Sequence, residues 1–182
     1  MWRYLSPAIA FLVLGGLFWF ALHRIGNGTL DVREIKSPLI GRAAPTFTLP
    51  LVMDPAQRFD SHTMAGKVYI VNVWGTWCPA CREEHESLIA LSRITGVPFI
   101  GIDWKDDGAE ARRYLTQLGN PYQTVVADAE GRIAIDWGVY GAPETFLVSK
   151  DGKVLAKHAG ALTEAVWADK FAPLVAQQGG AP

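Results

Sequence analysis

The spacing of hydrophobic positions changes several times along this chain, and each spacing predicts a different element. Residues 4–22 form one uncharged apolar run, whereas apolar and polar positions alternate over 46–51, which predicts an edge strand. Continuous β-branched and aromatic runs are typical of buried strands, and apolar positions three or four apart are typical of helices. The main elements predicted in this way are strands at 68–74, 97–102, 124–127, 145–148 and 154–156, and helices that begin near Cys78, Asp106 or Asp107, and Thr163.

The order of these elements indicates the fold class. Strands alternate with helices through most of the chain, as in an α/β domain with parallel strands. The last two strands flank Lys150–Lys153, where Asp151-Gly152 is a strong hairpin signal. The sequence therefore predicts an α/β sandwich with a mixed sheet.

The apolar run at 4–22 has the length of a membrane-spanning helix. Its 19 residues would extend for roughly 30 Å, which is about the thickness of the hydrocarbon core. A cleaved signal peptide is the alternative, but no small-residue cleavage site follows the run. We expect a membrane anchor at 1–24, a linker at 25–38, the globular domain at 39–176 and a tail at 177–182.

Composition and charge narrow the function classes. Of the 182 residues, 49% are hydrophobic, which excludes disorder as a description of the whole chain. Lys+Arg 17 against Asp+Glu 18 leaves no basic surplus for a nucleic-acid binder. Two cysteines cannot form a disulfide framework or an all-thiolate zinc site.

The two cysteines form a C-x-x-C motif, Cys78-Pro79-Ala80-Cys81, where a buried strand passes into a helix. Unpaired N–H groups and the partial positive charge at a helix start stabilise a thiolate. Pro79 is tolerated there because the first helical position needs no N–H partner. We expect Cys78 to be the exposed nucleophile and Cys81 the resolving thiol of a disulfide-exchange cycle.

The sequence supports three other interpretations of the cysteine pair less well. A zinc site would recruit His85, but no fourth ligand is evident nearby. Covalent haem attachment needs a histidine directly after the second cysteine, where this chain has Arg82. A permanent disulfide across four residues would stabilise the fold little.

The segment Val73–Cys81, in which Trp77 precedes the motif, resembles the active site of thioredoxin-fold proteins. Further segments are similar to the membrane-anchored thioredoxin-like reductases of cytochrome c maturation, the CcmG/DsbE family. These segments are Cys81–His85, Gly101–Asp107, Leu118–Tyr122 and Gly138–Phe146.

The resemblance implies a thioredoxin-like fold, with helices on both faces of a mixed central sheet, preceded by one N-terminal transmembrane helix. It places the domain in the periplasm, tethered to the bacterial inner membrane. The implied function is a reductant that keeps the CxxCH cysteines of apocytochrome c, or a partner thiol protein, reduced for haem attachment. A transmembrane thiol-disulfide reductase would supply the electrons. We expect neither a cofactor nor a metal ion.

The resemblance also implies roles for residues around the cysteines. Pro143 matches a cis proline, and a cis bond after Ala142 would let backbone groups there pair with an extended substrate. Asn72 replaces the buried aspartate of ordinary thioredoxins, and Glu84 and Glu144 match acidic positions of the family. Negative charge near the sulfurs raises the thiol pKa and makes the pair a better electron donor.

Two other function classes remain open from the sequence. One is a general periplasmic disulfide exchanger or a thiol peroxidase. The other is a non-catalytic module that holds apocytochrome for the maturation machinery. Replacing Cys78 by Ser separates them, because only a holder would keep its function in maturation.

Overall fold

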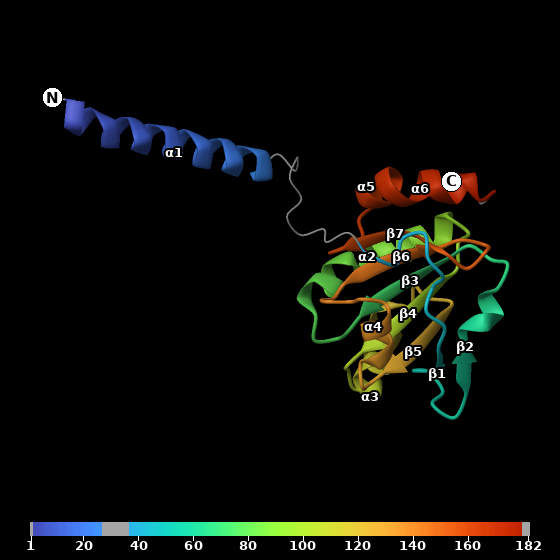
Figure 1. Cartoon of the computed structure of the whole chain (residues 1–182). Coiled ribbons are helices and arrows are strands. Elements are labelled where there is room, and N and C mark those ends of the chain that lie inside the picture. The colour runs from blue at the N-terminus through green and yellow to red at the C-terminus, as the bar shows by residue number, and fades with distance from the viewer. Residues whose placement is uncertain (1, 27–36, 180–182) are drawn as a thin grey trace. The chain divides into compact units, whose positions relative to one another are not determined.

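The computed structural model describes residues 2–26 and 37–179, in two compact units divided after Ile35 (Figure 1). The first unit contains the 25-residue helix α1 (Trp2–Gly26). Most of the predicted linker, residues 27–36, and the end of the tail, 180–182, lie outside the described residues. Within the described part of the chain, no helix combines the length and the apolar character needed to cross a membrane.

The second unit is built on a five-stranded mixed sheet in the order β5-β4-β3-β6-β7. Strands β3, β4 and β5 run parallel, and β6 and β7 are antiparallel to their neighbours. Every residue of the central strand β3 is buried, as its continuous apolar run predicts. The strands are β3 (Tyr69–Trp74), β4 (Phe99–Trp104), β5 (Thr124–Asp128), β6 (Glu144–Val148) and β7 (Val154–Ala159).

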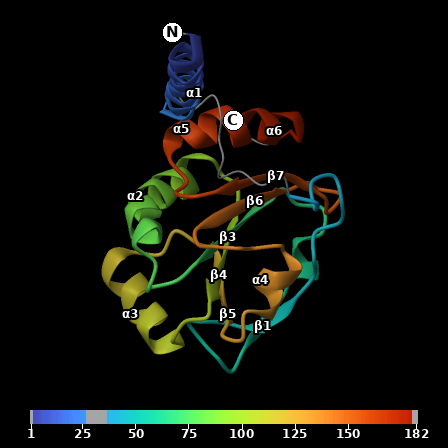
Figure 2. The ribbon, with the colours of Figure 1, turned by 60° about the vertical axis from the view of Figure 1, so that its left-hand side comes forward.

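Helices cover both faces of the sheet, which confirms the predicted thioredoxin-like α/β architecture. One apolar cluster packs α2 (Pro79–Ile94), α3 (Gly108–Leu118) and the C-terminal helices against one face. The other cluster packs α4 (Arg132–Asp136) against the opposite face. Figure 2 shows α2 and α3 on one side of the sheet and α4 on the other.

The predicted C-terminal helix is interrupted. It begins with α5 (Glu164–Val166), capped by Thr163 as predicted, and ends with α6 (Ala172–Gln177). Between them lies the π-helical turn η2 (Trp167–Phe171). Pro173 has no N–H to donate to the preceding turn, so regular α-helical hydrogen bonding cannot continue through this point.

The segment before β3 contributes a second, two-stranded sheet, β1 (Thr48–Pro50) with β2 (Arg58–Asp60). The residues that follow β2 form the 3-10 turn η1 (Ser61–Met64), which Asp60 caps by accepting from the His62 N–H. The same segment touches both outer strands of the large sheet: Leu51 bridges Val126 of β5, and Gly41 N donates to the Val154 carbonyl of β7.

Candidate active site

The cysteine pair lies where β3 passes into α2, and the structure joins Cys78 and Cys81 in a disulfide with Cα atoms 5.3 Å apart. Cys78 is the N-cap of α2, and its Sγ accepts a hydrogen bond from the Cys81 N–H at 3.1 Å. The expectation of an exposed Cys78 is wrong for this disulfide form, because Cys78 is 3% exposed and Cys81 5%. Pro79 is the first helical residue, where its missing N–H costs nothing. A thiolate on Cys78 would thus accept the hydrogen bond of an N–H at the positive end of a 16-residue helix.

Hydrogen bonds to the end of β4 and to the β4–α3 loop stabilise the turn before Cys78. The Thr76 N–H and hydroxyl both donate to the Asp106 carboxylate, the hydroxyl at 2.8 Å. The Trp77 indole N–H donates to the Trp104 carbonyl at 3.1 Å. A Cβ on Gly75 would lie 2.5 Å from the Trp77 indole nitrogen, so any other residue here would displace the Trp77 ring from its present position.

Trp74 and Trp77 lie in different environments. Trp77 is half exposed beside the cysteines, which suits a residue that shields the sulfurs from one side. Trp74 is buried in the core, with its ring packed against Tyr114 and Tyr122. Its contribution is therefore to the packing under the site.

Glu84 lies one helical turn after Cys81 on the same buried face of α2. Its carboxyl is 1% exposed, and its oxygens accept from Asn72 Nδ2 at 3.0 Å and from the Leu162 N–H at 2.6 Å. Burial raises the pKa of Glu84 to about 7, against the opposing effect of these two hydrogen bonds. The carboxyl therefore titrates near neutral pH in the core beside the cysteines.

Asn72 occupies the strand position that holds an aspartate in ordinary thioredoxins, and it is fully buried. Its amide donates to both Glu84 and Thr145 and accepts from the Tyr122 hydroxyl at 2.7 Å. The acidic group at this place in the core thus comes from α2, and a neutral amide on β3 positions it.

Glu144 begins β6 and is also buried, at 1% exposure. Its Oε1 accepts from the Tyr140 N–H, and its Oε2 pairs with the Lys157 ammonium at 2.8 Å. Sequence reasoning missed Lys157 because a register shift between Leu147 and Val148 changes which residues of β7 face inward. The charge of Glu144 is therefore compensated, whereas Glu84 has only neutral donors among the described residues.

The Ala142–Pro143 peptide bond is cis, which confirms the isomer implied by the resemblance. Ala142 packs against the apolar cluster that contains both cysteines, and Pro143 is buried. The Pro143 carbonyl accepts from the Gly160 N–H at 2.9 Å. In the described part of the chain, the N–H and carbonyl of Ala142 make no hydrogen bond, so both remain available to another chain.

Sequence reasoning also missed Asp103 as a candidate. It pairs with Trp74 in the β4–β3 register, is 1% exposed, and accepts no hydrogen bond from any described residue. Burial, with the nearby carboxylates of Asp106 and Asp107, raises the pKa of Asp103 to about 8. An aspartate that directly follows a run of apolar strand residues could have indicated a buried carboxyl from the sequence alone.

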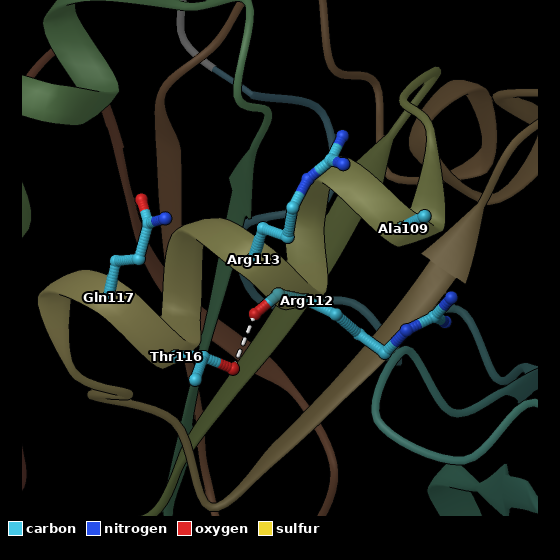
Figure 3. A pocket seen from close by; sticks show the side chains of 5 residues that line it. All are labelled: Ala109, Arg112, Arg113, Thr116 and Gln117. Carbon is cyan, nitrogen blue, oxygen red and sulfur yellow. Dashed lines mark hydrogen bonds between the residues drawn. The ribbon is translucent and has the colours of Figure 1, made fainter.

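Two other features lie apart from this chemistry. His85 is buried, with Nε2 3.1 Å from the Gly119 carbonyl, and among the described residues no group of three potential ligands could hold a metal ion. A surface pocket on α3 contains none of the predicted site residues (Figure 3). Its lining residues are Ala109, Arg112, Arg113, Thr116 and Gln117.

Comparison with known proteins shows which family this chain is similar to. A family model described as Redoxin matches residues 39–170. The thiol:disulfide interchange protein DsbE of Allochromatium vinosum is 43% identical over 99% of this chain and 97% of the relative. The DsbE protein of Pseudomonas aeruginosa is 45% identical over 95% and 96%. A thiol:disulfide interchange protein of Chlorobium tepidum has a TM-score of 0.61 at 26% identity, covering 80% of this chain and 98% of that structure.

Proposed function

Because this chain belongs to the redoxin family and, within it, to the DsbE thiol:disulfide interchange proteins, we propose that it acts as a reductant in cytochrome c maturation. Its activity is thiol-disulfide exchange through Cys78 and Cys81. The observation that best supports the reducing direction is the buried Glu84 carboxyl one helical turn after Cys81.

The exchange proceeds in two substitutions at sulfur. The Cys78 thiolate attacks a disulfide sulfur of the client, which forms a mixed disulfide and releases one client thiolate that takes up a proton. The Cys81 thiolate then attacks Cys78 Sγ, closes the Cys78–Cys81 disulfide and releases the second client thiolate. Two electrons pass from protein to client, and an external dithiol must restore the pair.

The position of Glu84 supports donation of electrons. A carboxylate in the low-dielectric core disfavours thiolate formation at neighbouring sulfurs. The reduced form is thereby destabilised relative to the disulfide, and the pair becomes a stronger reductant. For this couple, about 30 mV corresponds to ~1.4 kcal/mol, so one buried charge is enough to matter.

We assign substrate docking to Ala142 and Pro143. The unpaired N–H and carbonyl of Ala142 are the groups that an extended peptide would need for strand-like pairing. The packing of Ala142 against the cysteine cluster would bring such a peptide to the sulfurs. Trp77, through its indole hydrogen bond to the Trp104 carbonyl, and Pro79, as the first residue of α2, support the cysteine turn.

The proposed client is apocytochrome c with an oxidised CxxCH motif, or a thiol protein that acts between the two. The proposed electron donor is a transmembrane thiol-disulfide reductase. We further propose that residues 1–24 anchor the chain in the bacterial inner membrane, with residues 39–176 in the periplasm. The 19 uncharged residues at 4–22 support the anchor, and the A. vinosum relative aligns over 99% of this chain.

The client can be identified by trapping. In a full-length Cys81→Ser variant, Cys78 still attacks the client but nothing resolves the mixed disulfide, so the client stays covalently bound. We expect mass spectrometry of the trapped species from cells making c-type cytochromes to identify an apocytochrome or a thiol protein bound through Cys78. Cys78→Ser/Cys81→Ser is the matched control and should trap nothing.

Other outcomes contradict the proposal. A broad set of unrelated periplasmic proteins trapped by the variant would indicate a general exchanger. Normal cytochrome c maturation with Cys78→Ser would indicate a holder. The proposed topology has its own test: a reporter active only in the periplasm should be active when fused after residue 176, and alkaline washing should leave the chain in the membrane fraction.

A further inference from the structure

A buried lysine lies under the loop that carries the proposed docking residues. The Lys157 side chain is only 5% exposed, although lysine is almost never buried without partners. The loop above it, residues 137–143, joins α4 to β6 and ends in Ala142 and Pro143. We call it the α4–β6 loop.

The Lys157 ammonium contacts this loop at both ends. Its Nζ donates to the Gly138 carbonyl at 2.9 Å, near the start of the loop, and pairs with Glu144 Oε2 at 2.8 Å, directly after the loop. Between these two contacts, the ammonium lies 4.4 Å from the centre of the Tyr140 ring. The ammonium also lies 5.2 Å from the centre of the Phe146 ring on β6, so one hydrogen bond, one ion pair and two aromatic rings surround its charge.

The carboxylate of Glu144 extends the same connection. Its second oxygen accepts from the Tyr140 N–H at 3.1 Å, so the middle of the loop is also linked to Lys157 through one intermediate group. Burial strengthens each of these electrostatic contacts because little water competes for them. A single β7 side chain thus fixes the start, the middle and the end of the α4–β6 loop.

We propose that Lys157 is a positioning residue for peptide docking: by fixing the α4–β6 loop it holds Ala142 and Pro143 where an extended client can pair beside the cysteines. The proposal rests on the proposed function, in which Ala142 and Pro143 dock the client. It assigns Lys157 no contact with the sulfurs. Its loss should therefore weaken peptide binding far more than it alters the intrinsic reactivity of Cys78, which it can affect only through the uncovered charge of Glu144.

The test compares a large and a small disulfide. The full chain, with dithiothreitol in excess to regenerate the dithiol, reduces either a peptide with a disulfide-closed CxxCH motif or 2-hydroxyethyl disulfide, which is too small to need docking. For Lys157→Met we expect the KM for the peptide to rise about tenfold or more, with kcat within about twofold. The rate with 2-hydroxyethyl disulfide should change by less than about twofold, because that disulfide does not use the docking loop and senses only the uncovered charge of Glu144. Lys157→Arg, which keeps the charge and the donors, should restore most of the peptide KM.

Lys153→Met is the matched control, because Lys153 lies next to the same strand with its side chain about half exposed and its charge paired with Asp151. It should leave both activities unchanged. A folded Lys157→Met protein with a normal peptide KM would overturn the proposal. So would an equal loss with both disulfides, which would show that Lys157 acts on the cysteines or on the fold as a whole.

Lys157→Met leaves Glu144 buried without its counter-ion, and the variant risks unfolding. The double variant Lys157→Met/Glu144→Gln removes both charges together and keeps an acceptor for the Tyr140 N–H. If Lys157 positions the loop, this folded variant still has a raised peptide KM. If Lys157 only neutralises Glu144, its peptide KM is normal and the proposal is wrong.

The same assay separates this inference from the proposed function. Wild-type protein that reduces 2-hydroxyethyl disulfide but not the peptide would contradict client docking and Lys157 positioning together. Wild-type protein that reduces both, with a normal peptide KM in the Lys157 variants, would contradict only the inference.

Discussion

Asn72 on β3 donates a 3.0 Å hydrogen bond from its amide to the Glu84 carboxyl on α2, and both side chains are almost completely buried. The contact joins the strand that leads into the cysteine motif to the helix that follows it. It places a carboxyl with a pKa of about 7 one helical turn from Cys81. The charge in the core beside the sulfurs therefore changes within the range of physiological pH.

Glu84→Gln should make the cysteine pair less reducing. Removing the carboxylate removes a charge that opposes thiolate formation, so the reduced form is stabilised. We expect the reduction potential to rise by about 10–30 mV at pH 7.5. Equilibration with defined mixtures of reduced and oxidised glutathione, read by the fraction of free thiol, measures it. A potential equal to or more negative than that of the wild type would refute the role of Glu84.

The stability of the oxidised protein should fall as pH rises through the titration range of Glu84. The ordinary pKa of glutamate is 4.5, and that of Glu84 in the folded state is about 7. Between these two pH values the folded state holds a proton that the unfolded state has released. The unfolding free energy therefore decreases with increasing pH, by about 3 kcal/mol from this group.

Urea unfolding of the wild type and of Glu84→Gln at pH 5 and pH 8 isolates this contribution. The decrease should be smaller in the variant, because glutamine does not titrate. It should not vanish, because the elevated pKa of Asp103 contributes in both proteins. The comparison concerns the pH dependence rather than absolute stability, since glutamine cannot accept from both Asn72 and Leu162. Equal decreases in the two proteins would contradict the buried, titrating Glu84.

Glu144→Gln should also make the pair less reducing, but by less than Glu84→Gln. The Lys157 ammonium 2.8 Å from its carboxylate already offsets most of its charge. The larger effect should be on stability, because the variant leaves a buried ammonium without its counter-ion, a change that costs roughly 3–5 kcal/mol. Glutathione equilibration and urea unfolding measure the two effects, and an unchanged or more negative potential would defeat the redox assignment.

Asp106→Asn should loosen the turn that precedes Cys78. The carboxylate accepts from both the N–H and the hydroxyl of Thr76, and an amide offers only one acceptor oxygen. We expect a loss of about 1–3 kcal/mol in unfolding free energy, measured by urea unfolding of the oxidised protein. In a double-mutant cycle with Thr76→Val, additive losses would show that the two residues do not interact.

The sequence predicts most of the fold because its main strands are fully buried. The apolar runs at 68–74, 97–102 and 124–127 locate β3, β4 and β5 to within two residues. The helix α4 spans only Arg132–Asp136, too short to show a helical period, and it was not predicted. The π-helical turn was also missed, because apolar spacing does not register the effect of Pro173 on backbone hydrogen bonds.

For the candidate site, the sequence predicted the features that lie within one short segment, but not the contacts between residues far apart in the chain. The spacing of Cys78 and Cys81, together with its place between a buried strand and a helix, predicted disulfide exchange. The partners of Glu84 and Glu144 lie on other elements. Asn72 and Lys157 can be recognised as these partners only when the pairing of the strands and their packing against α2 are known. The resemblance drew attention to both glutamates, but only the structure shows that one is held by neutral donors and the other by a cation.

The bridges that the segment before β3 makes to β5 and β7 affect how this protein behaves among copies of itself. An outer strand with unpaired N–H and carbonyl groups invites pairing with another molecule. Here Leu51 bridges Val126 on one border of the sheet, and Gly41 and Arg42 bond to Val154 on the other. A second copy that paired at these positions would first have to displace the chain's own backbone, so less of each border is open to another molecule.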